Sequence, residues 1–89
     1  MYETTPSIYL KIGELLMEQI GTRDFFSGSV TLYDGDVVCR LLTTLIVSRD
    51  SEDGGIVSLH PVWWDFTTTL GDELLCNDFS FSEMLKAVY

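Results

Sequence analysis

Residues 25–48 read FFSGSVTLYDGDVVCRLLTTLIVS, and this stretch decides the fold. Up to Tyr33, apolar and small polar side chains alternate with a period of two, which is typical of a half-buried strand. The pair Asp34-Gly35 then predicts a tight type I′ hairpin turn, because both residue types tolerate positive φ angles. From about residue 37 to residue 48 both faces carry apolar groups, which indicates a central strand covered on one side and partly covered on the other.

A helix over about residues 6–20 is predicted before this hairpin. Thr5 is a suitable N-cap, and Pro6 fits the first helical position, where a backbone N–H would be unpaired anyway. Apolar residues then recur at helical spacing, from Ile8 to Ile20. Gly21 supplies a C-terminal cap, so both ends of this helix are marked.

A third strand is predicted after the hairpin. Residues 50–55 have the composition of a polar hairpin loop. Residues 56–59 and 62–69 form one strand, which we expect to be broken or bulged at Pro61 because proline cannot donate to a ladder. The result is three or four antiparallel strands in meander order.

The C-terminus is predicted to be helical. Ser80 and Glu83 have the spacing of a capping box, with Phe79 and Met84 placed as a hydrophobic staple. Residues 71–76 are expected to add one turn of helix before it. Residues 1–89 therefore form a single small α+β domain of order α-β-β-β-α, with a layer of helix on one face of the sheet.

Composition narrows the class of function. The chain has a net charge of −9 with only five Lys and Arg residues, which argues against direct nucleic-acid binding and against anionic membranes. No apolar run approaches the length of a membrane span, and the first residues lack the pattern of a signal peptide. The cytoplasm is the expected location, and Cys39 and Cys76 are expected there as free thiols.

The two tryptophans point to a contact surface. Trp63 and Trp64 are neighbours in a predicted strand, so they point to opposite faces and cannot both enter one core. If Trp64 packs inward with Val62, then Trp63 faces outward and needs cover, from the domain itself or from another chain. Aromatic anchors are common at interface hot spots, so Trp63 is the centre of a candidate partner surface. Two further aromatic residues are candidates for its flanks: Phe25 and Tyr33.

Acidic residues suggest an alternative function. Residues 50–89 hold eight acids and one base, and such a surface could imitate DNA and block the basic groove of a nucleic-acid enzyme. The residues expected to carry this activity are Asp50, Glu52, Asp53, Asp72, Glu73 and Asp78. The loop at residues 50–55 does not follow the ligand spacing of a calcium-binding EF-hand, so no metal is predicted.

An enzyme is the third alternative and the weakest. Cys39, His60 and Asp65 supply one nucleophile, one base and one acid, but most sequences contain such a set. Cys39 also lies within an apolar strand, where a thiol is expected to be inert. The sequence predicts no cofactor.

The chain resembles, in its size, acidity and lack of a catalytic motif, small proteins encoded by phages and mobile elements. No specific motif carries this resemblance, and it implies no residue roles. The function expected from the sequence is a small acidic, non-enzymatic protein-interaction domain. Its partner is expected to be a protein, either a second copy in a homodimer or a basic surface.

Overall fold

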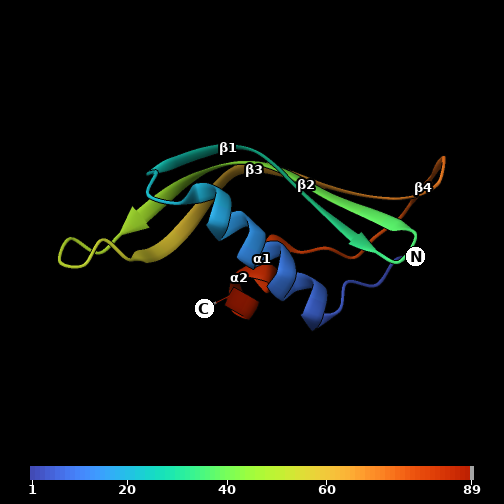
Figure 1. The fold of residues 1–89 in the computed structure, drawn as a ribbon, viewed down its shortest axis with the longest axis horizontal. Helices are drawn as coiled ribbons and strands as arrows, with labels where there is room; N and C mark the ends of the chain where they lie inside the picture. The colour runs from blue at the N-terminus through green and yellow to red at the C-terminus, as the bar shows by residue number, and fades with distance from the viewer. Residues whose placement is uncertain (89) are drawn as a thin grey trace.

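The computed structural model describes residues 1–88 and confirms the α+β architecture: one helix, four antiparallel strands in a single open sheet, and a second, short helix (Figure 1). Strand order in the sheet is β1-β2-β3-β4. Both helices lie on the same side of the sheet (Figure 1), which we call the inner face. The elements are α1 (Pro6–Ile20), β1 (Phe25–Asp34), β2 (Val37–Arg49), β3 (Ile56–Leu70), β4 (Glu73–Leu75) and α2 (Phe81–Val88).

Helix α1 begins and ends where the sequence predicts. The Thr5 hydroxyl accepts a hydrogen bond from the Ile8 N–H at 3.3 Å, and the Gly21 N–H donates to the Met17 carbonyl at 3.1 Å. One stripe of the helix is buried against the sheet. Its buried residues are Ile8, Ile12, Gly13, Leu16 and Ile20.

The core lies between the inner face and the two helices. In β2 every second residue from Cys39 to Val47 is buried, and the residues between them are not. Helix α2 contributes Phe81 and Met84 to the same core. The other side of β2 was expected to be partly covered, but no element within residues 1–88 lies over it (Figure 1). That side is the outer face of the sheet.

The turn between β1 and β2 differs from the predicted type. Asp34 pairs with Val37, so the two central turn residues are Gly35 and Asp36. Gly35 has a φ of 60°, while among residues 1–88 only glycines have a positive φ. Positive φ at the first central position alone is the pattern of type II′, so the type I′ prediction was wrong. The position of the hairpin is as predicted.

Strand β3 carries the predicted irregularity beside Pro61. Thr44 pairs with Trp63, but Leu45 pairs with Pro61, so Val62 is an extra residue without a partner in β2. This is a β-bulge. It interrupts the alternation of β3, and the strand continues on both sides of it.

The segment after β3 is a strand and not the predicted turn of helix. Leu70 pairs with Glu73 across a short turn, and Thr68 pairs with Leu75. The Thr68 hydroxyl also donates to the Leu75 carbonyl at 2.9 Å. These cross-strand bonds give the segment partners that a single isolated helical turn lacks, so the strand is favoured.

Helix α2 begins at the predicted place but without the predicted cap. The Ser80 hydroxyl lies 3.0 Å from the Ser82 hydroxyl, and Glu83 forms an ion pair with Lys86 at 3.2 Å. The Ser80 N–H, which a capping box would bind to Glu83, donates instead to the Tyr9 hydroxyl at 3.1 Å. A contact with α1 thus replaces the local capping box.

Candidate functional site

Within residues 1–88, the fold leaves the outer face of the sheet without a covering element (Figure 1). Its residues alternate with the core residues along each strand. The strand register arranges them in rows, and each row runs across the sheet through residues that are paired on neighbouring strands. The hydrogen bond of 2.9 Å between the Ser27 and Thr44 hydroxyls joins two of them in one row. The outer face comprises Phe25, Ser27, Ser29, Thr31 and Tyr33 of β1, Val38, Arg40, Leu42, Thr44, Ile46 and Ser48 of β2, Ser58, His60, Trp63, Asp65, Thr67 and Thr69 of β3, and Leu74 of β4.

Trp63 lies on the outer face and Trp64 on the inner face. Trp64 pairs with the buried Thr43, and its ring meets the ring of Phe79 edge-on with centroids 5.4 Å apart. Trp63 pairs with Thr44 and keeps 48% of its surface exposed. Val62 was expected to join Trp64 in the core, but it is the extra residue of the bulge and is 64% exposed.

Apolar side chains gather around Trp63 at one end of the outer face. The adjacent row pairs Phe25 with Ile46, and Ile46 with His60. Phe25 is 56% exposed and Ile46 is 50% exposed. Ile46 is a diagonal neighbour of Trp63, within reach of a large side chain. We call Phe25, Ile46 and Trp63 the Trp63 patch.

Tyr33 lies at the opposite end of the outer face and does not flank Trp63. It shares a row with Val38 and Thr69, and Leu74 continues that row into β4. Thr69 lies six positions after Trp63 in β3, which corresponds to about 20 Å at the rise of a strand. Tyr33 and Leu74 are exposed by 72% and 70%, so a second apolar group stands at this end.

The outer face is almost free of charge, in a chain with a net charge of −9. Asp65 is its one acid and Arg40 its one fixed base. They occupy adjacent rows of β3 and β2, because Asp65 pairs with Leu42 and Arg40 pairs with Thr67. Depletion of charge together with aromatic residues is the composition of an interface core.

His60 has hydrogen-bond partners on its own face. Its Nε2 lies 2.8 Å from the Ser58 hydroxyl and 3.1 Å from the Ser48 hydroxyl. Both serines belong to the row beside His60 on the outer face. The imidazole is therefore held by two hydroxyl groups, which accounts for its position without a ligand.

The three residues of the enzyme alternative do not meet. Cys39 is buried in the inner face, whereas His60 and Asp65 belong to the outer face. Burial raises the pKa of the Cys39 thiol, so the thiolate is disfavoured. The Tyr2 hydroxyl donates to Asp34 at 2.7 Å, and burial together with this bond raises the pKa of Tyr2. Cys39 and Cys76 are both free thiols.

The six acids of the DNA-mimic alternative are divided between separate parts of the molecule. The β2–β3 loop and the β3–β4 turn lie at opposite ends of a molecule whose longest dimension is 46 Å (Figure 1). Within the loop, Asp50 accepts from the Glu52 N–H and Asp53 accepts from the Gly55 N–H, each at 2.7 Å. Three of the six lie in the loop (Asp50, Glu52, Asp53), one in the turn (Asp72), one at the start of β4 (Glu73) and one before α2 (Asp78).

Asp78 has a structural contact of its own. Its carboxylate accepts a hydrogen bond from the Thr4 N–H at 2.7 Å, which ties the N-terminal segment to the segment before α2. This bond lowers the pKa of Asp78. The carboxylate is therefore engaged within the domain.

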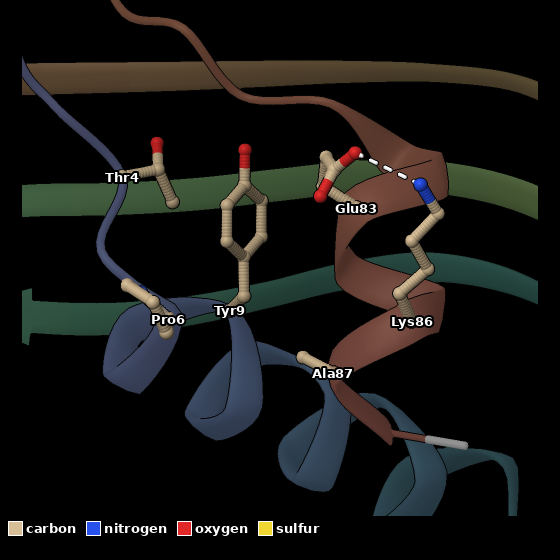
Figure 2. Close-up of a pocket in the computed structure, with 6 residues that line it drawn as sticks. All are labelled: Thr4, Pro6, Tyr9, Glu83, Lys86 and Ala87. Atoms are coloured by element: carbon tan, nitrogen blue, oxygen red, sulfur yellow. Dashed lines mark hydrogen bonds and ion pairs between the residues drawn. The ribbon is translucent and has the colours of Figure 1, made fainter.

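An open pocket of about 410 Å³ lies between the start of α1 and helix α2 (Figure 2). The sequence does not predict it, because it depends on how the two helices pack. Two polar groups around it are paired with other groups: the Tyr9 hydroxyl with Ser80 and Asp78, and Glu83 with Lys86. The buried Thr4 hydroxyl, by contrast, has no hydrogen-bond partner within residues 1–88. The residues that line it are Thr4, Pro6, Tyr9, Glu83, Lys86 and Ala87.

No helix of residues 1–88 has both the length and the apolar character to cross a membrane. Within the same residues, no three His, Cys, Asp or Glu side chains converge as ligands for a metal ion. Comparisons of the chain with protein-family models, with curated proteins and with solved structures found no match.

Proposed function

We propose that this chain is a non-enzymatic protein-interaction domain that binds its partner through the outer face of the sheet. One observation carries the proposal: an acidic protein keeps a whole sheet face almost uncharged, uncovered and supplied with large apolar side chains. An exposed apolar patch with a polar surround is characteristic of a contact surface.

The Trp63 patch is the main apolar anchor of this proposed surface. A tryptophan contributes much contact area with few rotatable bonds, so its burial by a partner costs little conformational entropy. Phe25 and Ile46 extend the contact across the neighbouring strands. The hydroxyl groups of the middle rows supply hydrogen bonds around it.

The partner that fits the outer face is a protein with an apolar, uncharged surface. Only Asp65 is available on this face to a basic partner. Association is therefore expected to depend on apolar contact and to persist at high salt, since screening weakens only charged pairs.

We propose the cytoplasm as the location, where Cys39 and Cys76 remain reduced.

Affinity capture from the native host cell tests this function. The immobilised protein is compared with Trp63→Ser and with Leu10→Ser, a control that removes an exposed apolar residue of α1 on the other side of the molecule. We expect a specific protein to be retained at high salt by the wild type and by Leu10→Ser, but not by Trp63→Ser. A partner that all three proteins retain at low salt and release at high salt would overturn the proposal in favour of the acidic mimic.

A further inference from the structure

We infer that the partner of the outer face is a second copy of this chain, packed face to face about a two-fold axis that crosses β2 near Leu42. This inference rests on the proposed function and names the occupant of the proposed surface. Three features of the outer face carry it: its charge, its distribution of apolar groups and its size.

Charge selects the outer face as the place where two copies can meet. A net charge of −9 makes two copies repel each other in most orientations. The outer face carries Asp65 and Arg40, which cancel, so contact through this face brings the fewest like charges together. A basic partner, by contrast, gains little from a face with one acid.

The apolar groups of the outer face are arranged for an antiparallel dimer. Phe25 and Tyr33 stand at opposite ends of β1, four rows apart, with Leu42 of β2 in the middle row. Consider a two-fold axis through Leu42 that lies in the plane of the contact and runs perpendicular to the strands. It reverses the strand direction of the second copy, so each end of one outer face lies over the opposite end of the other outer face. Phe25 then meets Tyr33 of the second copy, and the two Leu42 side chains meet each other.

The same axis gives Trp63 and Asp65 partners. Trp63 is placed over Thr67 of the second copy, whose cross-strand neighbour is Arg40. A guanidinium near a tryptophan ring is a favourable cation–π contact. Arg40 of each copy also approaches Asp65 of the other, so the charges of the face are compensated at the contact.

An axis parallel to the strands is less favourable. It would place the end that carries Asp34, Asp72 and Glu73 against the same end of the second copy. Like charges would then be close together, without a base between them. The perpendicular axis places this end against the opposite end, which carries the loop acids Asp50, Glu52 and Asp53. That end also holds two bases, Arg23 and Arg49, so fewer uncompensated like charges meet.

The size of the outer face indicates a weak dimer. The five rows that cross all three long strands cover roughly 27 Å by about 15 Å, on the order of 400 Å² of plane per copy. Stable interfaces bury about 800 Å² per partner, so this contact is about half that size and corresponds to a weak, transient association. We expect a dissociation constant on the order of 10–100 μM.

Sedimentation equilibrium tests the self-association. The wild type is expected to change from monomer to dimer mass as its concentration passes through this range. Trp63→Ser and Phe25→Ser should weaken the dimer by about tenfold or more each, because each removes a large aromatic contact. Leu10→Ser should leave it unchanged. A wild type that stays monomeric throughout would overturn this inference, while host-cell capture that depends on Trp63 would still support the proposed function.

Crosslinking tests the position of the axis. Leu42→Cys is made together with Cys76→Ser, since Cys76 is exposed and Cys39 is buried. A short bismaleimide should link two copies rapidly at residue 42. Thr31→Cys in the same background is the matched control, because residue 31 lies away from the axis. Linkage of Thr31→Cys without linkage of Leu42→Cys would indicate pairing along the edge of β1 and would overturn the face-to-face arrangement.

Discussion

The Arg49 guanidinium at the end of β2 donates a hydrogen bond of 2.7 Å to the Gly21 carbonyl, just after α1. The same group donates to the Arg23 carbonyl at 2.7 Å and to the Gly54 carbonyl at 3.0 Å. It also lies 3.3 Å from the Asp24 carboxylate. One side chain therefore joins the helix, the connection to β1 and the β2–β3 loop.

Replacement of Arg49 by lysine is expected to destabilise the domain. An ammonium group cannot reach three carbonyls at once, and hydrogen bonds of a charged donor contribute more than neutral ones. We expect a loss of about 2 kcal/mol in the free energy of unfolding, measured by urea denaturation. Arg40→Lys is the matched control, since Arg40 is exposed on the outer face and should change the value little. Equal losses for the two variants would contradict the role of Arg49.

The two tryptophans are expected to differ in their effect on stability. Trp64 is 40% exposed, but its ring contacts the rings of the buried Phe79 and Phe81, so Trp64→Ala removes aromatic packing at the edge of the core. We expect it to lower the free energy of unfolding by about 2–3 kcal/mol. Trp63→Ala, at a concentration where the protein is monomeric, should cost less than about 1 kcal/mol. Thermal denaturation of both variants checks this, and a larger loss for Trp63→Ala would show that the assignment of faces is wrong.

Gly13 marks the close approach of α1 and α2. A Cβ at residue 13 would collide with the Val88 side chain, so the usual gain of about 1 kcal/mol for alanine over glycine in a helix should not appear in Gly13→Ala. In a Val88→Ala background the same substitution should recover that gain. A double-mutant cycle from urea denaturation measures the coupling. Additive effects would mean that the two helices are not in contact here.

Asp78 should make stability depend on pH in the acidic range. Its folded pKa lies below the ordinary value of 3.8, because the carboxylate accepts the Thr4 N–H. The stabilisation is therefore fully present above the unfolded pKa and is lost as the pH falls through the folded pKa. Asp78→Asn keeps an acceptor oxygen but cannot titrate, so its melting temperature should lie below that of the wild type at neutral pH and converge with it under acid conditions. Asp72→Asn is the control, and parallel curves for Asp78→Asn and the wild type would contradict the prediction.

Local patterns in the sequence predicted most of the fold. The helix from Pro6 to Ile20 and the hairpin around Gly35 follow from periodicity and from turn residues, which act over a few positions. Segment 71–76 was assigned wrongly because it is too short to have a period, and its structure depends on pairing with Thr68. The prediction of a capping box at the start of α2 was wrong for a similar reason, since the Ser80 N–H bonds to Tyr9, which is far from it in the sequence.

The candidate surface could be predicted in part. Alternation shows that Trp63 and Trp64 face opposite sides, and this needs no tertiary information. The separation of Tyr33 from Trp63 depends on the register of three strands, which alternation alone does not provide. The low charge of the outer face is likewise visible only when the rows are known.

The extra residue at Val62 changes which positions of β3 are sensitive to mutation. Before the bulge the core receives the odd-numbered Leu59, and after it the core receives the even-numbered Phe66 and Thr68. Without the bulge, Leu59 and Phe66 would point to opposite sides of the sheet. A scan of polar substitutions along β3 should therefore find that the intolerant positions change from odd to even numbers at residue 62. Deletion of Val62 should move the side chains of one half of β3 to the opposite face of the sheet.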